Sequence, residues 1–497
     1  MEKKKYIYLG GGLDPTVLTI LIPILEGYKN EEGIIIDQGD FQIFQEYLNK
    51  KKKKFQNFSA FDAILVDYYK FNLKYFLLFI LNLLKNFYFY MKLLFFFSYR
   101  DKKNYSSAFS HSYWDTCIRD IDDNQLKPTF FRKLKILIKL IFHEIHIKEL
   151  INIYPIKSAF LGHQVYKHRI SLEEFRKQNI KVFTQGNFAF FRQKRSKDVE
   201  WTSVNKNLLK KIKKNISTFT INRFWNLRSL GKLQDADFIA ASKIKSKSKF
   251  NLQKNIIFLH VFKDSPFAKI DKNRIFFDYY HWVIETIKIL KDSDEIWSLR
   301  IHPNSKAWGE NSSTVLEHIK HKHFKGFFPK NIRIDDNSHS NLKVFSEMNR
   351  CVTFSGTSSI ESSCYGIKPI IISDNSLSEL NKNYVLKPIS IKQYRELLLK
   401  KNFDPIFIQK NKAVQESKFL LYLLYNVLSF KKSFFRVSKK LNVFQNTSIA
   451  KKYQIFFGVI NNLEDYSFRK KFHQLGICLK KNNSRTLDLK FLNLLNN

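Results

Sequence analysis

The chain has 497 residues, a length that favours two domains plus an extension. Hydrophobic residues make up 44% of it, enough to fill real cores, so wholesale disorder is not expected. Lys and Arg number 85 against 44 Asp and Glu, and the net charge of +41 favours anionic partners such as nucleic acid, an acidic membrane surface or phosphorylated substrates. The lysines are spread along the whole chain, so biased composition accounts for much of this charge. No motif for binding RNA or DNA is visible, which leaves nucleic acid a minor alternative.

The four cysteines are scattered and form no CxxC pair with zinc spacing: Cys117, Cys351, Cys364 and Cys478. They fit a reducing cytoplasm. The N-terminal stretch MEKKKYIYLGGG has a basic start but neither a long apolar core nor a cleavage site, so it is not expected to be a signal peptide.

The first half of the chain reads as a βαβ series. Short apolar runs predict strands at Tyr6–Leu9, Gly33–Asp37 and Phe61–Asp67. The first of them runs into three glycines, two of which are Gly11 and Gly12, and a predicted helix at Thr16–Ile22 follows. This unit lacks the lysine of a P-loop and the spacing of a dinucleotide fingerprint. The glycines either let the chain turn tightly or let an acceptor approach the backbone, and both readings stay open.

The most hydrophobic part of the chain lies at about residues 72–97. Its longest unbroken apolar run, Tyr75–Leu81, is too short to span a bilayer. A helix would stack Lys74, Lys85 and Lys92 along one face. This pattern fits a helix in the plane of an anionic membrane, with its lysines at the headgroups, and it equally fits a buried helix pair in an enlarged first lobe.

A polar constellation follows in the stretch SHSYWDTCIR. On a helix, Asp115 and Arg119 lie one turn apart and can pair, and Tyr113 would flank a cleft. An ordinary helical ion pair explains this spacing equally well.

The next strand-end cluster comes after a long amphipathic helix predicted at Lys133–Ile153. The strand Ala159–Leu161 ends in a loop that contains His163 and Tyr166, at the kind of position where ligand-binding residues gather. A lone histidine is still more often a structural one. A helix through Phe175 and the strand Lys181–Thr184 complete the first lobe.

The second half predicts another sheet of alternating strands and helices. A lysine-rich polar region places the lobe boundary near Ser242, so the expected domains are a first lobe over 1–242, a second lobe over 243–385 and a helical extension over 386–497. The predicted strands are Asn255–Phe262, Trp297–Ile301, Asn331–Ile334, Cys351–Phe354 and Ile370–Ile372. Helices are predicted at Asp278–Leu290 and at Ile360–Tyr365, the latter ended by Gly366.

Two strand ends of this second sheet predict a nucleotide-phosphate site. One ends in Arg300, His302 and Pro303, and the other runs through 355–359 (SGTSS) into a short helix. Small hydroxyl residues that open a helix, with free backbone N–H groups, suit a phosphate, and the arginine and histidine could close on it from the other side. The acidic triplet Asp292-Ser293-Asp294 resembles a metal-binding DxD motif but falls at the wrong end of the sheet, so it is interpreted as a solvated turn and no metal is expected.

On these residues the chain resembles the GT-B glycosyltransferases of bacterial surface-polysaccharide synthesis, in particular the capsule-synthesis and Kdo/sialyl-transferase-like group. The matching positions are His302-Pro303, Ser358-Ser359, Glu361 and the segment Gly366–Ile371, with a fainter match over Tyr113–Arg119. The resemblance is good over residues 255–375, fainter over 105–190 and absent from 390 on.

The resemblance implies an α/β, GT-B-like fold of two Rossmann-like lobes whose parallel sheets face each other across a cleft. It further implies an inverting, metal-independent transfer of a sugar from a nucleotide sugar, a CMP-sugar being favoured, to a surface polysaccharide or a lipid-linked glycan. No cofactor is expected besides the nucleotide sugar as co-substrate. The expected location is the cytoplasm, either free or at the inner face of the cell membrane.

The expected roles are assigned residue by residue. The base for the acceptor hydroxyl is Asp115, with His163 as second choice, and Arg119 orients Asp115 or holds an acidic acceptor. The acceptor-side residues are Gly11, Gly12, Tyr113 and Tyr166. The nucleotide and phosphate ligands are Arg300, His302, Pro303, Ser355, Gly356, Thr357, Ser358, Ser359 and Glu361.

Other classes stay open as alternatives. A non-hydrolysing sugar-nucleotide epimerase shares the two-lobe fold, but would turn over a UDP-sugar without an acceptor or a membrane. A CDP-alditol phosphotransferase would use the same histidine and serine positions. A non-enzymatic membrane- or polysaccharide-binding protein would require the strand-end cluster to be vestigial.

Overall fold

The computed structural model of the chain describes residues 5–10, 33–37, 64–66, 73–96, 107–119, 128–161, 165–185, 190–192, 213–214, 216–230, 253–264, 275–276, 278–303, 305, 309–335, 339–400 and 410–423. Several expectations fall outside these residues: the helix at Thr16–Ile22, the residues Gly11, Gly12 and His163, and the part of the extension beyond residue 423.

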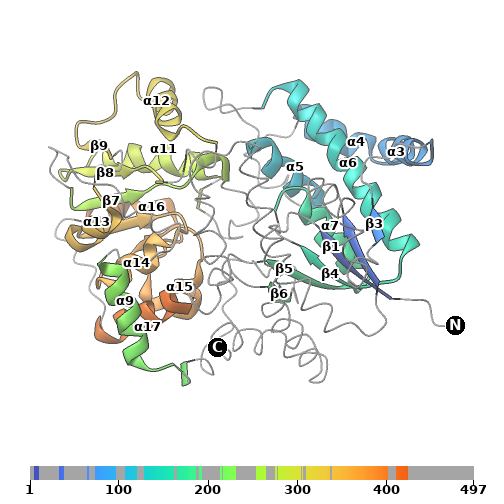
Figure 1. The fold of residues 1–497 in the computed structure, drawn as a ribbon. Helices are drawn as coiled ribbons and strands as arrows, with labels where there is room; N and C mark the ends of the chain where they lie inside the picture. The colour runs from blue at the N-terminus through green and yellow to red at the C-terminus, as the bar shows by residue number, and fades with distance from the viewer. Residues whose placement is uncertain are drawn as a thin grey trace, which may run out of the picture.

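The first lobe is built on a six-stranded sheet with the order β3-β2-β1-β4-β5-β6 (Figure 1). Its strands are β1 (Tyr6–Gly10), β2 (Gly33–Asp37), β3 (Ile64–Val66), β4 (Ile156–Leu161), β5 (Lys181–Gln185) and β6 (Phe190–Arg192). Neighbouring strands run parallel except β5 and β6, which pair antiparallel at the edge. The predicted strands of the first half are therefore confirmed, and β6 is an addition to them.

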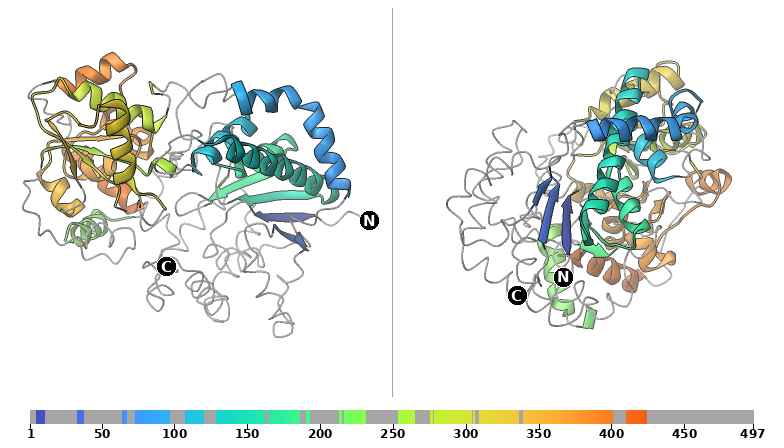
Figure 2. Two further views of the ribbon diagram at one scale, coloured as in Figure 1. Left: turned by 90° about the horizontal axis from the view of Figure 1, so that it is seen from above. Right: turned by 90° about the vertical axis from the view of Figure 1, so that its right-hand side faces the viewer.

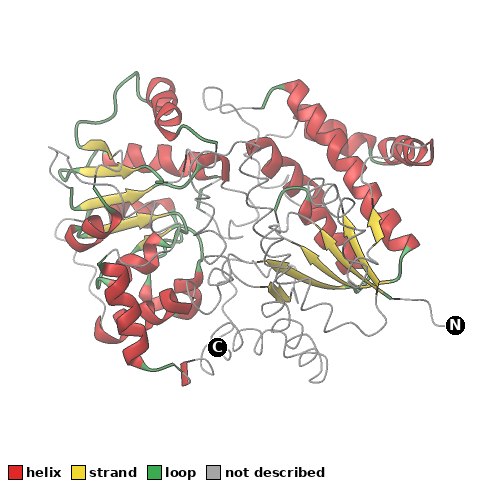
Figure 3. Ribbon diagram, in the orientation of Figure 1, coloured by secondary structure: helices red, strands yellow, loops and turns green. Residues whose placement is uncertain are grey.

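The second lobe is built on a five-stranded parallel sheet with the order β11-β10-β7-β8-β9. Its strands are β7 (Asn255–Phe258), β8 (Trp297–Arg300), β9 (Ile332–Asp335), β10 (Arg350–Thr353) and β11 (Ile370–Ile371). Counted from the first strand of each lobe, both sheets contain the order 3-2-1-4-5 of a doubly wound fold. The chain thus has the expected GT-B-like α/β fold in two lobes, which lie side by side in Figure 3.

Helices on one face of the first sheet form the core of the first lobe (Figure 2). They are α5 (Ala108–Arg119), α6 (Phe130–Ile153) and α7 (His168–Lys177). The predicted amphipathic helix is α6, and the hydroxyl of Thr129 caps its N-terminus by accepting from the Arg132 amide. The buried face of α7 meets the sheet where the ring of Phe175 packs 4.9 Å from that of Tyr8.

Both faces of the second sheet are covered. Alternate strand residues point to opposite sides, so Ile257 and Val352 pack with one set of helices while Ile256 and Cys351 pack with another. The helices of this lobe are η5 (Phe262–Asp264), α11 (Tyr279–Leu290), α12 (Ser312–His323), α13 (Asn341–Glu347), α14 (Ser358–Cys364), α15 (Ser376–Leu380) and η8 (Lys382–Tyr384). Gly366, with φ +87°, ends α14 as expected.

Three further helices pack onto the second lobe. These are α9 (Thr218–Ser229), α16 (Ile391–Leu399) and α17 (Lys410–Tyr422). Phe224 and Trp225 of α9 share a core with α14 and α17, and Tyr394 of α16 is fully buried against α11. These contacts place α9, which precedes the boundary expected near residue 242, and α16 and α17, which fall within the expected extension, against helices of the second lobe.

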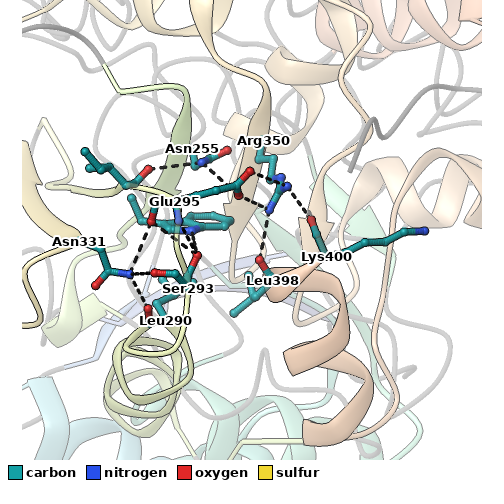
Figure 4. A network of polar contacts seen from close by, with 10 residues as sticks. Asn255, Leu290, Ser293, Glu295, Asn331, Arg350, Leu398 and Lys400 are labelled. Atoms are coloured by element: carbon teal, nitrogen blue, oxygen red, sulfur yellow. Dashed lines mark hydrogen bonds and ion pairs between the residues drawn. The ribbon is translucent and has the colours of Figure 1, made fainter. Parts of the chain in front are cut away.

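A polar network holds the amino ends of the second sheet (Figure 4). Arg350, which begins β10, pairs with Glu295 at 2.8 Å and donates to the carbonyls of Leu398 (3.1 Å) and Lys400 (2.7 Å) at the end of α16. Asn331 donates to the carbonyls of Leu290 and Ser293 before β8. The expected turn at 292–294 therefore lies at the amino edge of the sheet, where Asp292 forms an exposed ion pair with Arg395.

The hydrophobic stretch expected at 72–97 forms α3 (Leu73–Lys85), α4 (Phe87–Met91) and the π-helix η3 (Lys92–Phe96). Tyr90, Leu93 and Leu94 are buried, as a core helix pair requires, but no residue of α3 is buried. Among the described helices none alone has the length and apolarity to cross a membrane, whereas the helices at 73–85 and 87–95, which meet at a bend of 77°, pass that criterion as a pair.

Candidate functional site

The second sheet changes its winding direction between β7 and β10. From β7 the chain proceeds through β8 and β9 on one side, and it then returns to place β10 and β11 on the other. In open α/β sheets, ligands bind outside the carboxyl ends of the strands at such a switch point. The residues that follow β7 and β10 are therefore the first place to look for a site.

The side chain of His260 meets the backbone of Gly356 at this switch point. A Cβ atom added to Gly356 would lie 3.0 Å from Thr353 Oγ1, 3.1 Å from His260 Nε2 and 3.1 Å from Ser358 Oγ. Three polar atoms, from β10, from the segment after β7 and from the start of α14, thus converge on a position without a side chain. Such a cluster suits a polar ligand that approaches the backbone closely.

Neighbouring strand ends add His302 and Ser355 to this cluster. In the sheet register Phe258 pairs with both Arg300 and Thr353, and His260, His302 and Ser355 each stand two residues further along. The Leu259 amide also donates to the Arg300 carbonyl at 2.9 Å, which continues the ladder beyond the strands. The side chains of His302 and Ser355 are half-buried at this edge, as is Pro303, and Thr357 is exposed. The structure therefore brings five predicted residues, His302, Ser355, Gly356, Thr357 and Ser358, to one edge with His260.

The segment that carries His260 is fixed by buried polar groups. Its amide donates to the hydroxyl of Tyr279 on α11, and the two rings lie edge to face with their centroids 5.6 Å apart. Glu310, 2% exposed, accepts from the Lys263 amide at 2.8 Å and from the Ser312 hydroxyl. These contacts hold the loop after β7 against the start of α12 and preorganise the site.

Arg300 does not join the site. Its guanidinium is 1% exposed and donates to the carboxylate of Asp335, to the carbonyl of His339 at 2.6 Å and to the side chain of Asn341 at 2.7 Å and 2.9 Å. These partners lie on β9 and at the start of α13. The expected phosphate contact is corrected accordingly, because the donors of this arginine are used to tie β8 to the neighbouring elements.

Ser359 is likewise structural. Its hydroxyl is buried, donates to the Gly356 carbonyl at 2.7 Å and accepts from Asn375 at 2.8 Å. The amides of Ser359 and Ile360, expected to face a phosphate, donate to the carbonyls of Gly356 and Thr357. The serine therefore shapes the turn that presents Gly356 and does not face a ligand.

Glu361 is engaged on the other side of α14. It forms a buried ion pair with Arg228 of α9, whose side chain is 3% exposed. Burial, with the nearby carboxylate of Glu361 as a lesser cause, raises the pKa of Tyr365 to about 12. The expected nucleotide contact of Glu361 is therefore corrected to a helix–helix contact.

In the first lobe, Tyr113 and Asp115 are enclosed. They are 0% and 1% exposed on α5, and Tyr113 belongs to the core between α5 and α6. Burial raises the pKa of the Tyr113 hydroxyl. In contrast, Arg119 at the end of α5 lies with Cζ 4.7 Å from the ring centroid of Tyr166, whose φ is +57°. Arg119 and Tyr166 are therefore in contact, as two expected site residues, whereas Tyr113 and Asp115 are buried and do not reach the surface.

His260 was missed by sequence reasoning for a definable reason. The apolar run after Asn255 predicts a strand through Phe262, which treats this histidine as an interior residue. The strand ends at Phe258, so His260 follows it. The available signal was His260 itself, the polar residue inside the apolar run, which stands near the point where a strand of typical length ends.

No group of three or more His, Cys, Asp or Glu side chains is arranged to hold a metal ion within the described residues.

No family model and no curated protein sequence matches the chain. Solved structures do match, and most of those with the strongest similarity are described as UDP-GlcNAc 2-epimerases. The enzyme from Methanocaldococcus jannaschii, in complex with UDP-GlcNAc and UDP, is 13% identical with a TM-score of 0.23, over 84% of this chain and 99% of that one. The enzyme from Rickettsia bellii is 11% identical with a TM-score of 0.30, over 86% and 97%. The Anabaena protein HepE, in complex with UDP and glucose, is 9% identical with a TM-score of 0.27, over 88% and 99%.

The glycosyltransferase expected from the sequence is corrected at this point. The similar structures are mainly described as epimerases, which is the alternative that the sequence left open. Identities and TM-scores of this size do not carry an argument about activity, so the function is argued from the site alone.

Proposed function

We propose that the chain is an enzyme that binds a nucleotide sugar at the carboxyl edge of the second sheet. The observation that carries this proposal is the convergence of His260, Thr353 and Ser358 on Gly356 at the switch point between β7 and β10. The bare glycine lets a diphosphate approach the backbone, while imidazole and hydroxyl groups donate hydrogen bonds to its oxygens. His302 and Ser355, level with His260, extend the same polar edge.

The reaction class that we propose is non-hydrolysing epimerisation of a sugar nucleotide, preferably a UDP-sugar. An epimerase inverts one carbon of the sugar and keeps sugar and nucleotide joined in the product, so it requires no acceptor. The burial of Asp115 supports this choice, because a carboxylate that is 1% exposed is out of reach of an acceptor hydroxyl, and Asp115 was the first-choice base of a transferase. Epimerisation requires no acceptor and therefore no such base.

The test measures binding and turnover on the same preparations. UDP should bind to wild type and raise its melting temperature. His260→Ala should weaken binding by roughly tenfold, as expected for the loss of one hydrogen bond to a charged group. His321→Ala, which removes an exposed histidine of α12, is the matched control and should bind as wild type does.

Turnover then separates the reaction classes. Proton NMR of UDP-sugars incubated with the enzyme alone should show a second sugar nucleotide and no free UDP. Release of the nucleotide only when an acceptor glycan is added would reject epimerisation. Equal UDP affinity of wild type and His260→Ala would reject the site itself.

A further inference from the structure

The outer face of α3 is apolar although it is not part of any core. Leu73, Leu77, Leu81 and Leu84 recur every three or four residues and therefore form one stripe along the helix. They are between 53% and 72% exposed. Phe76 on α3, with Phe87 and Tyr88 of α4, extends the stripe. We call the surface formed by these seven residues the α3–α4 apolar face.

The opposite side of α3 already has its partner. Phe79 stacks on Phe142 of α6, with ring centroids 4.6 Å apart, and Lys74 forms an ion pair with Glu149 of the same helix. Tyr75, Leu78 and Leu83 pack against the core of α5 and α6. The helix is therefore held on the lobe by one side, and its leucine stripe is not needed for that attachment.

The position of the face leaves it open to a large partner. In Figure 2, α3 and α4 run along the rim of the first lobe, and α3 lies at the end remote from the second sheet. A second aromatic group stands at the start of α6, where Phe130 packs 5.3 Å from Phe95 and Phe131 is 80% exposed. A concentration of exposed large apolar side chains on neighbouring helices is typical of an interaction site.

The charges around the face identify the partner. The segment 73–96 contains no acidic residue, and of its three lysines Lys74 is paired with Glu149 of α6, which leaves Lys85 and Lys92 as the charges beside the face. Lys85 ends α3, and Lys92 lies with Nζ 4.0 Å from the ring centroid of Tyr88. An apolar stripe fringed by lysines and interfacial aromatic rings fits an anionic bilayer surface, in which leucines enter the acyl region and lysines meet the headgroups.

We propose that the α3–α4 apolar face docks this protein on an anionic lipid bilayer, with α3 lying in the plane of the membrane. A second copy of the chain fits less well, because a twofold contact pairs this face with itself and the segment 73–96 offers no acidic residue to pair with the lysines of the other copy. Crossing the bilayer is not part of the proposal, since the stripe occupies only one side of α3. The inference is independent of the proposed enzymatic function.

The experiment is flotation of the full-length protein with vesicles of phosphatidylcholine alone or mixed with phosphatidylglycerol. Wild type should float with the mixed vesicles, and less so at high salt. Replacement of Leu77 and Leu81 together by Glu should reduce the bound fraction by more than about tenfold, since two leucines no longer leave water. Phe327→Glu is the matched control: it changes an 82% exposed aromatic residue outside the face and should float as wild type does.

A second variant tests the charge separately. Replacement of Lys85 and Lys92 by Glu should abolish the preference for phosphatidylglycerol while the melting temperature stays that of wild type. Failure of wild type to float with mixed vesicles would overturn the proposal. So would equal flotation of the Leu77/Leu81 variant, or a wild-type dimer that these leucine substitutions dissociate in the absence of lipid binding.

Discussion

Arg300 shows how one buried side chain can hold several elements together. Its three nitrogens donate to groups on β9, on the segment after it and on α13, so the guanidinium is satisfied without a ligand. It stands at a strand end, two residues before His302, where a residue that binds a phosphate would also stand. Burial and partners distinguish the two roles, and neither is visible in a sequence.

The first prediction concerns this residue. Arg300→Ala should lower the free energy of unfolding by roughly 3–5 kcal/mol, because it leaves the carboxylate of Asp335 buried without its charge partner. Urea denaturation followed by circular dichroism measures this change. Arg395→Ala is the control, since it removes an arginine from an exposed pair with Asp292 and should cost less than about 1 kcal/mol. Wild-type stability combined with a loss of UDP affinity would return Arg300 to the phosphate site.

The two serines at the start of α14 also differ in role because of their burial and hydrogen-bond partners. Ser358 and Ser359 are neighbours of identical type, yet one hydroxyl lies beside Gly356 and His260 and the other bonds within the turn. Sequence reasoning could place both at the start of a helix. It could not decide which of them faces outward, because that depends on the rotation of a seven-residue helix about its axis.

At the scale of elements, α16 is held to α11 by a buried hydroxyl. The Tyr394 hydroxyl accepts from Trp282 Nε1 at 2.9 Å and contacts the Thr286 hydroxyl, also at 2.9 Å. All three residues are essentially inaccessible to solvent. Burial, the largest cause, raises the pKa of this tyrosine, so it remains neutral and able to serve both partners.

The second prediction removes only this hydroxyl. Tyr394→Phe should destabilise the protein by about 1–3 kcal/mol, because the indole N–H of Trp282 then stays buried without its acceptor. Tyr88→Phe, at a 72% exposed position, should change stability by less than about 0.5 kcal/mol. Both changes are measured as shifts in the midpoint of urea denaturation, with the dependence of the unfolding free energy on urea concentration unchanged. A Tyr394→Phe protein as stable as wild type would show that α16 is attached mainly by its apolar contacts.

Element types were readable from the sequence, but their partners were not. The apolar runs and the turn residues between them predicted nearly all strands of both sheets, because strand length and boundaries are local properties. No helix was predicted at α9, and α16 was predicted only as one of the helical segments after Ile391. An amphipathic pattern tells which face of a helix is buried but not against what, so the packing of α9 on α14 and α17 was not readable.

At the scale of the whole molecule, repeated strand order explains why the fold was predictable and the site only in part. Both sheets contain the order 3-2-1-4-5, which is one of the orders that alternating strands and helices adopt in doubly wound folds. That order fixes the switch point between β7 and β10, and with it the edge that carries His302, Ser355, Gly356 and Ser358. It does not fix where each strand ends, and this uncertainty concealed His260.

Alkaline pH should lower the free energy of unfolding, because burial raises the pKa of several groups in the folded state. Burial raises the pKa of Tyr365 from its ordinary 10.0 to about 12, and burial together with the hydrogen bond to Glu416 does the same for Tyr384. Burial likewise raises the pKa of the Cys351 thiol from 9.0 to about 12. The folded state keeps these protons above the pH at which the unfolded chain releases them, so the stability they contribute is complete below pH 9 to 10 and is lost as the pH rises toward 12.

The last prediction follows from this window. The free energy of unfolding of wild type, measured in urea at a series of pH values, should fall between about pH 10 and 12. Tyr365→Phe should show a shallower fall, because one of the raised pKa values is gone, and subtracting the two curves cancels the titration of the many lysines. Tyr88→Phe, in which an exposed tyrosine is removed, should follow the wild-type curve. The absorbance of tyrosinate provides an independent signal: the buried tyrosines should ionise together with the loss of circular dichroism, whereas ionisation of all tyrosines in the folded protein would contradict the burial on which the prediction rests.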